Sequence, residues 1–342
     1  MIYLTLILGF GLLMLCGDLL VRGSVGMAAR FGVAPLIIAL TIVAVGTSLP
    51  ELFISADATL QGAPGLALGN IIGSNISNIL LVLGLPALIY PIACSGLNLP
   101  ANAWVMLASS LMLTVLCFLG PIARGEGALL LVMFVLFLSW TAMSARTHRI
   151  PGSPASQTRK LIQTVEASGR LAETTLERVI DEPVPTAVMS WLVIAMLLLV
   201  GLAGLPLGAH LVVTGGTSIA RAWSVPENII GLTLIALGTS LPELSTSLMA
   251  AWRQQSDIAI GNVIGSNIVN VLMVIGMSSL IAPIPVAQSF LHVDLWIMLL
   301  TALAILPVIA TRGSITRLNG AIFVLAYAIY LISLLQRAGS LL

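Results

Sequence analysis

Charged side chains are scarce in this sequence of 342 residues: they make up 8% of the chain, and Lys160 is its only lysine. Hydrophobic residues make up 58%, and the mean hydropathy is +1.10. A water-soluble domain needs far more polar surface than this composition supplies. The composition therefore predicts an integral membrane protein surrounded by lipid, and the lack of a basic patch argues against nucleic-acid binding.

Cysteine and histidine are rare as well. Cys16, Cys94 and Cys117 are far apart, without metal-ligand spacing, so we expect them to serve in packing. An enzyme in the membrane would need a nucleophile with its base, or a metal held by nitrogen ligands, and the repeated segments described below contain neither. We therefore expect no enzymatic activity and no cofactor. The amino terminus lacks the features of a signal peptide, which predicts a retained first helix.

Long apolar runs, separated by short breaks with Gly, Pro or Arg, are abundant. A membrane-spanning helix needs about 20 apolar residues, and the breaks divide the chain into ten such segments. No obligatory protein partner is evident. The sequence predicts an all-α integral membrane protein with ten transmembrane helices near 2–21, 33–60, 64–89, 101–119, 126–144, 187–216, 225–252, 257–282, 291–310 and 315–336.

An internal repeat organises these segments. The stretch GTSLPEL occurs at 46–52 and 238–244, and GNIIGSNISN at 69–78 returns as GNVIGSNIVN at 261–270, so both are shifted by 192 residues. Each half holds about five helices, and because five is odd the second half starts from the opposite membrane face. We expect two inverted five-helix repeats, 1–144 and 187–342, joined by a polar linker at 145–186.

Charge asymmetry orients the predicted protein. The linker carries Lys160 and five arginines, and the membrane face that holds it also holds further basic residues. Since cytoplasmic loops carry the excess of Arg and Lys, we expect a protein of the plasma (inner) membrane with the linker in the cytoplasm and both termini outside. The further basic residues on that face are Arg22, Arg30, Arg253, Arg312 and Arg317.

Two carboxylates stand within the predicted helices. Glu51 and Glu243 occupy the same position of the repeat, where a charged side chain costs about 3 kcal/mol or more on insertion into the membrane. A structural ion pair would offset this cost, but the hydrophobic cores of the repeats contain neither Lys nor Arg. A bound cation is therefore the expected partner of the two carboxylates.

Oxygen donors accompany both glutamates. Pro50 and Pro242 cannot donate to the helix ladder, so we expect the helices to break there and leave backbone carbonyls free. A threonine lies four residues before each glutamate, on the same helix face. In the next helix of each repeat, a serine and an asparagine lie four residues apart and also share one face. Such all-oxygen sets suit hard cations such as Ca2+, and Na+ would compete for them. The candidate cation ligands are Glu51, Glu243, Thr47, Thr239, Ser48, Ser240, Ser74, Ser266, Asn78 and Asn270.

The paired GTSLPE and GSNxxN segments resemble the two alpha repeats of the cation/calcium exchanger superfamily, with its prokaryotic sodium/calcium exchanger branch most similar. The resemblance covers both halves and nearly the whole chain. It implies alternating access in which the first and sixth helices slide across a fixed core. It also implies that Ca2+ is held by Glu51, Glu243, Thr47 and Thr239, and that Na+ sites are completed by Ser48, Ser74, Ser240 and Ser266.

The resemblance and the residues together predict an antiporter that expels Ca2+ from the cytoplasm in exchange for external Na+. Asn270 stands where these exchangers commonly have Asp, so the site holds two carboxylates, which balance one Ca2+ or two Na+. Coupling to H+ stays open, because Glu51 and Glu243 can bind protons in place of Na+. A passive channel fits less well, because buried carboxylates bind tightly and release slowly.

Three further acidic residues lie outside the two motifs. We expect Asp18, whose counterpart is His210, to make an interfacial or interhelical polar contact. Asp57 lies at a helix end, where it is either solvated or draws cations toward the site. Asp294, like the nearby His292, is expected at the protein surface.

Overall fold

The structure, a computed structural model, describes residues 2–96, 98–147, 189–222 and 236–339. These residues are almost entirely helical, as predicted. Nine helices of the described part are long and apolar enough to cross a membrane. The remaining predicted span, 225–252, is described only from residue 236 on, and most of the predicted linker lies outside the described residues.

The first half consists of helical segments and one short strand, with π-helical turns marked η. Its elements are α1 (Ile2–Phe31), α2 (Pro35–Ile38), η1 (Ala39–Val43), α3 (Ala44–Thr47), α4 (Leu49–Leu60), α5 (Pro64–Ser77), η2 (Asn78–Val82), α6 (Gly84–Ile89), β1 (Ile92–Ala93), α7 (Leu99–Leu119) and α8 (Arg124–Thr147).

The second half repeats most of this order. Its elements are α11 (Trp191–Ala222), α13 (Ala236–Thr239), α14 (Leu241–Trp252), α15 (Ser256–Val269), η4 (Asn270–Ile275), α16 (Gly276–Ile281), η5 (Phe290–Asp294), α17 (Leu295–Ala304), α18 (Leu306–Ala310), β2 (Ser314–Ile315) and α19 (Arg317–Gly339). The strands β1 and β2 form a small antiparallel ladder that joins the two halves.

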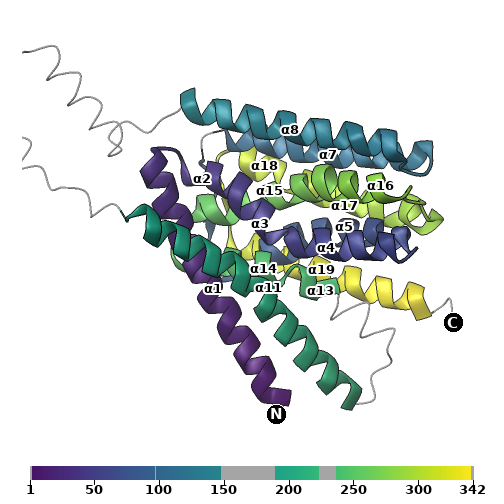
Figure 1. Ribbon diagram of the computed structural model, residues 1–342, viewed down its shortest axis with the longest axis horizontal. Helices are drawn as coiled ribbons and strands as arrows, with labels where there is room; N and C mark the ends of the chain where they lie inside the picture. Colours follow the sequence, from purple (N-terminus) through teal and green to yellow (C-terminus); the bar gives the residue numbers. More distant parts are fainter. Residues whose placement is uncertain (1, 97, 148–188, 223–235, 340–342) are drawn as a thin grey trace, which may run out of the picture.

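Two groups of helices are visible in Figure 1. The long helices α1 and α11 lie side by side and cross the others diagonally, while most of the remaining helices run along one direction. An 18-residue apolar stretch of Ser256–Ile281 is 100% buried and one of Pro64–Ile89 is 78% buried, whereas the corresponding stretches of Arg124–Ala145 and Arg317–Arg337 are only 22% buried. The two Asn-bearing helices of the repeats therefore form the centre of the bundle, and α8 and α19 lie at its periphery.

Glycines let α1 and α11 approach each other closely. A Cβ atom added to Gly201 would lie 3.0 Å from the backbone nitrogen of Leu20, and one added to Gly208 would lie 3.1 Å from that of Leu13. Small residues at helix contacts allow such backbone proximity in membranes.

The first helix is longer than predicted. The sequence predicts an end near residue 21, but α1 continues to Phe31. The basic residues that suggested a loop are accommodated along the helix: Arg22 pairs with Asp18 at 2.9 Å, and the Arg30 guanidinium stacks 5.4 Å from the centre of the Trp191 ring. Interactions of these side chains, which a hydropathy pattern does not reveal, extend the helix.

The predicted helix breaks occur at both repeats. The backbone leaves helical geometry at Ser48 (φ −84°, ψ 4°), between α3 and α4, and at Ser240 (φ −86°, ψ 2°), between α13 and α14. Pro50 and Pro242 follow in the first turn of the next helix, where a missing N–H is tolerated. The same local sequence thus produces the same break twice.

Candidate functional site

Glu51 and Glu243 lie in the first turns of α4 and α14, directly after the two helix breaks. Both side chains are fully buried, with 0% of each residue exposed. Ser48, three residues before Glu51, donates from its hydroxyl to Glu243 Oε1 at 3.4 Å, which links the two glutamate-bearing segments. The fold therefore brings together two carboxylates that are 192 residues apart in the sequence.

Hydroxyl groups of both repeats surround the Glu243 carboxylate. Thr47, Ser48 and Ser266 face it, and the Ser48 hydroxyl donates to its Oε1 atom at 3.4 Å. The Thr47 hydroxyl lies 3.4 Å from that of Ser266 and donates to the Asn262 side chain at 3.2 Å. Predicted ligands from the first repeat thus meet those of the second across one buried polar cluster.

The asparagines of α5 and α15 cross-link the two repeats. Asn75 donates to the backbone carbonyl of Asn267, and Asn267 donates to that of Asn75, each at 3.4 Å. The Asn78 amide donates to Asn267 Oδ1 at 3.0 Å, and the Asn270 amide donates to Asn75 Oδ1 at 3.1 Å. These bonds fix the side-chain orientations of Asn78 and Asn270.

Several oxygens of the predicted ligands are buried without a hydrogen-bond partner in the described structure. A buried polar group without a partner costs about 1–3 kcal/mol, and more when it is charged. A cation or proton would provide the missing interactions. The unpartnered oxygens are Glu51 Oε1 and Oε2, Glu243 Oε2, Ser74 Oγ, Ser240 Oγ, Asn78 Oδ1 and Asn270 Oδ1.

A cavity of about 380 Å³ leads toward this cluster. Ser74 and Thr239, two predicted ligands, lie on its wall, and Thr239 lies four residues before Glu243, across the break at Ser240. Leu331 and Leu334, near the carboxyl end of α19, lie on the wall as well. The cavity therefore connects the candidate site with the end of the bundle at which α19 terminates (Figure 1).

The chemistry of the site favours hard cations. Within the described ranges, three or more His, Cys, Asp or Glu side chains do not gather anywhere in a way that could hold a metal ion. Two carboxylates with hydroxyl and amide oxygens remain as the donor set. Oxygen donors of this kind suit Ca2+ and Na+, whereas Zn2+ and Cu2+ prefer imidazole or thiolate ligands.

The three acidic residues outside the motifs have different surroundings. The interhelical contact expected of Asp18 is confirmed, since it pairs with Arg253 at the end of α14. Asp57 is an exposed helix-end residue that accepts a hydrogen bond from Gln61 at 2.7 Å. The surface position expected of Asp294 is wrong: the residue is 4% exposed. A charged partner on another helix, described below, allows its burial.

Asn75 and Asn267 were missed as functional candidates. They position Asn78 and Asn270 through the hydrogen bonds described above, and both are at most 2% exposed. The signal was present, because these residues are identical in the two copies of the GSNxxN segment. Asn75 and Asn267 are not themselves predicted cation ligands; they orient the predicted ligands Asn270 and Asn78.

Comparisons with known proteins agree with the geometry. Residues 1–143 and 193–336 match the sodium/calcium exchanger protein family. The putative antiporter CaxA of Alkalimonas amylolytica is 36% identical over 328 residues, which is 95% of each chain. Inner membrane protein YrbG of Escherichia coli is 35% identical over 298 residues, covering 87% of this chain and 85% of its own.

The fold matches a solved structure as well. The sodium-calcium exchanger NCX_Mj, from a crystal soaked with Na+ and Ca2+, is 33% identical with a TM-score of 0.77, covering 96% of this chain and 97% of its own. The resemblance inferred from the repeated motifs is therefore confirmed. Because these matches extend over both halves, the chain belongs to the sodium/calcium exchanger family of membrane transporters.

Proposed function

We propose that this protein is a secondary active antiporter that exchanges cytoplasmic Ca2+ for external Na+ by alternating access at a mid-membrane site. One observation carries the proposal: Glu51 and Glu243 are both fully buried, Ser48 of the first repeat donates to Glu243, and most oxygens of the two carboxylates have no hydrogen-bond partner among the described residues. Two uncompensated charges in a low-dielectric interior are strongly unfavourable. A transported cation supplies the compensation.

Competition for the same oxygens would couple the two ions. Ca2+ takes 6–8 oxygen ligands, which the two glutamates and the neighbouring neutral groups supply together. Na+ would use the same carboxylates, so one species must leave before the other binds. The proposed ligand set is Glu51, Glu243, Thr47, Thr239, Ser48, Ser240, Ser74, Ser266, Asn78 and Asn270.

The proposed architecture has ten transmembrane helices in two inverted repeats, 1–144 and 187–342, around a linker at 145–186. The reciprocal asparagine bonds support it, because each contact from one repeat to the other recurs with the partners exchanged. The repeated helix breaks support it as well. A site between inverted repeats is common in secondary transporters.

The proposed orientation places the linker in the cytoplasm and both termini outside, in the inner membrane. It is supported by the distribution of Arg and Lys and by the likeness to an inner membrane protein. In this orientation the 380 Å³ cavity, which ends near the carboxyl end of α19, faces the outside.

Flux into proteoliposomes tests the proposal. We expect Ca2+ uptake when an outward Na+ gradient is imposed and the pH gradient is collapsed with an ionophore. Uptake driven by a pH gradient without Na+ would instead indicate H+ coupling, and uptake that needs no counter-ion would indicate a channel. Either result would overturn the proposed Na+ coupling.

A further inference from the structure

Asp294 is the one charged side chain among the described residues that line the 380 Å³ cavity. Arg337 holds its carboxylate at 2.9 Å (Nη2 to Oδ1) and 3.3 Å (Nη1 to Oδ2), and the Tyr330 hydroxyl donates to Oδ1 at 3.4 Å. The Asp294 side chain is 5% exposed and that of Arg337 is 33% exposed. The acid is therefore buried in the cavity wall, while its basic partner is partly exposed.

This ion pair lies on the route to the candidate site. The cavity that Asp294 lines also reaches Ser74 and Thr239, and leucine and other apolar side chains make up much of its remaining wall. A charge in a cleft with low-dielectric walls focuses the electric field and changes the local cation concentration. A cation that moves through the cavity would therefore be sensitive to the charge at this position.

The equivalent of Asp294 in the first repeat is identified by sequence spacing. Trp104 and Met106 precede Trp296 and Met298 by 192 residues, the same shift that relates the two motifs. Asn102 therefore occupies the position of Asp294, with an amide in place of the carboxylate.

Contacts identify the equivalent helix for α19. A Cβ atom added to Gly127 of α8 would lie 2.9 Å from the carbonyl oxygen of Gly276, and one added to Gly320 of α19 would lie 2.7 Å from that of Gly84. Gly84 and Gly276 are themselves equivalent. The glycines Gly127 and Gly320 thus correspond, which relates α8 to α19 by 193 residues.

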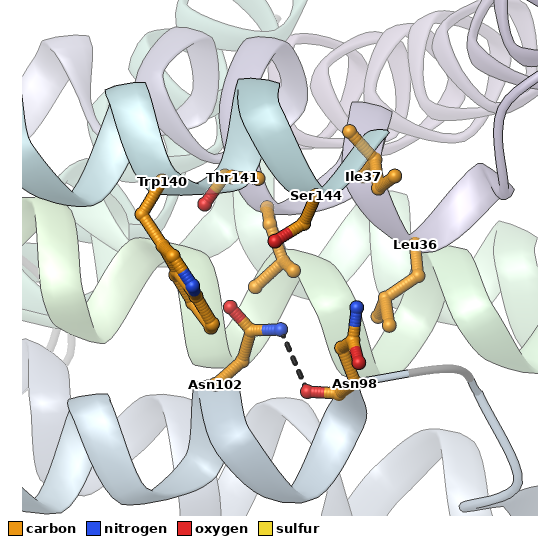
Figure 2. Close-up of a pocket in the computed structure, with 8 residues that line it drawn as sticks. Leu36, Ile37, Asn98, Asn102, Trp140, Thr141 and Ser144 are labelled. Atoms are coloured by element: carbon orange, nitrogen blue, oxygen red, sulfur yellow. Dashed lines mark hydrogen bonds between the residues drawn. The ribbon is translucent and has the colours of Figure 1, made fainter. Parts of the chain in front are cut away.

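Figure 2 shows the resulting counterpart of the cavity. Asn102 and Ser144 reach into a pocket of about 10 Å³, and by these two spacings they are the equivalents of Asp294 and Arg337. A volume of this size corresponds to about one water molecule. One half of the protein thus has a large cavity with an ion pair, and the other has a small pocket with an amide and a hydroxyl.

We propose that Asp294 and Arg337 set the cation attraction of one entrance only, and that the opposite entrance, lined by Asn102 and Ser144, lacks this control. The Asp294 carboxylate attracts cations into the 380 Å³ cavity, and Arg337 limits that attraction so that a divalent ion is released again. The attraction acts more strongly on Ca2+ than on Na+ because Ca2+ carries twice the charge. The inference rests on the proposed function, since it assumes that cations pass through this cavity.

Charge-changing variants test the proposal by the sign of their effects. In the face onto which the cavity opens, we expect Asp294→Asn to raise the half-saturating Ca2+ concentration about tenfold and that of Na+ about threefold, because the Boltzmann factor of a divalent ion is the square of that of a monovalent one. Arg337→Gln should lower both values in the same ratio. The double variant, which restores the net charge, should lie near the wild type.

The face specificity is tested with right-side-out and inside-out membrane vesicles. Asp294→Asn and Arg337→Gln should change the half-saturating Ca2+ concentration at the membrane face onto which the cavity opens, and leave that at the opposite face unchanged. Asn102→Asp should lower the half-saturating Ca2+ concentration at the opposite face only. Arg124→Gln is the matched control, because it removes a positive charge at the exposed start of α8, outside the described cavity wall.

Ca2+-dependent thermal stabilisation of the purified protein gives a readout that is independent of coupling. The Ca2+ concentration at which half of the stabilisation is reached should rise in Asp294→Asn and fall in Arg337→Gln. A wild type that binds Ca2+ but does not exchange it for Na+ would remove the proposed function and leave this inference standing. Midpoints that move in the same direction in both single variants, or in neither, would show that the pair is merely structural and overturn the inference.

Discussion

The side-chain amides of Asn75 and Asn267 each donate a hydrogen bond to the backbone carbonyl of the other residue, at 3.4 Å in both directions. Their own side-chain oxygens accept from Asn270 and Asn78, respectively. All four residues are at most 2% exposed. The network joins the two repeats at the centre of the bundle and orients two amide oxygens of the candidate site.

We expect Asn267→Ala to lower both stability and transport. The substitution removes the acceptor of the Asn78 amide and leaves that amide buried, at a cost of about 1–3 kcal/mol. It also frees Asn78 to rotate, which should weaken Ca2+ binding. Thermal unfolding in detergent and Ca2+ flux in proteoliposomes measure the two effects.

Asn75→Ala is the matched variant, since it removes the equivalent bonds on the other side. The two single changes should have similar effects, and the double variant should be less impaired than the sum of the singles, because both act on one network. Fully additive losses would show that the two asparagines act independently.

Neutralising either buried glutamate should abolish exchange. Glu51→Gln and Glu243→Gln keep the side-chain shape but remove the negative charge that offsets the cation. We expect a loss of Ca2+ affinity larger than the 10–100-fold typical of residues that only support metal ligands. Equilibrium Ca2+ binding and flux are the measurements.

Glu126→Gln provides the control for charge removal, because Glu126 caps the start of α8, outside the two repeated motifs, by accepting from the backbone of Ala123. It should exchange ions like the wild type. If both glutamine variants at the buried positions also retained exchange, the site would have to lie elsewhere.

The sequence was most informative where local chemistry determines the structure. Pro50 and Pro242 predict the helix breaks at Ser48 and Ser240, since a missing N–H acts on the neighbouring turn alone. The identical motifs predict that Glu51 and Glu243 belong to one site, which the hydrogen bond from Ser48 to Glu243 now supports.

Long-range contacts account for what the sequence left out. The π-helical turns that begin at Asn78 and Asn270 lie among buried residues, and no propensity signal in the sequence indicates them. Asp294 is buried because Arg337, on a different helix, pairs with it. Such partners are found only when the arrangement of the helices is known.

The repeat glycines offer a test of asymmetric packing. A Cβ atom on Gly265 would lie 2.9 Å from the Cα atom of Leu40 and 2.6 Å from Ala44 Cβ. Gly265→Ala must therefore push α15 away from η1 and α3, which we expect to cost about 1–3 kcal/mol. Thermal unfolding of the purified protein measures the loss.

Gly73→Ala is the equivalent change in the first repeat. Gly73 lines the cavity, and a Cβ atom there has no atom of the described residues within 4 Å. Its unfolding temperature should match that of the wild type. Equal losses in the two alanine variants would contradict the difference in packing between α5 and α15.

The ion pair between Asp18 and Arg253 should hold α1 against α14 in the present state. Its equivalent positions are His210 and Gln61, so the second repeat lacks such a pair. A partly exposed pair contributes up to about 1 kcal/mol, which corresponds to a shift of about fivefold between two states. If α1 moves across the bundle during exchange, Asp18→Asn should favour the opposite conformational state and slow thiol labelling of a cysteine introduced by Leu334→Cys in the cavity.

Arg22→Gln is the control, because Arg22 pairs with Asp18 within α1 only. Labelling that slows equally in both variants would show that the ion pair between α1 and α14 is not what stabilises the present conformational state.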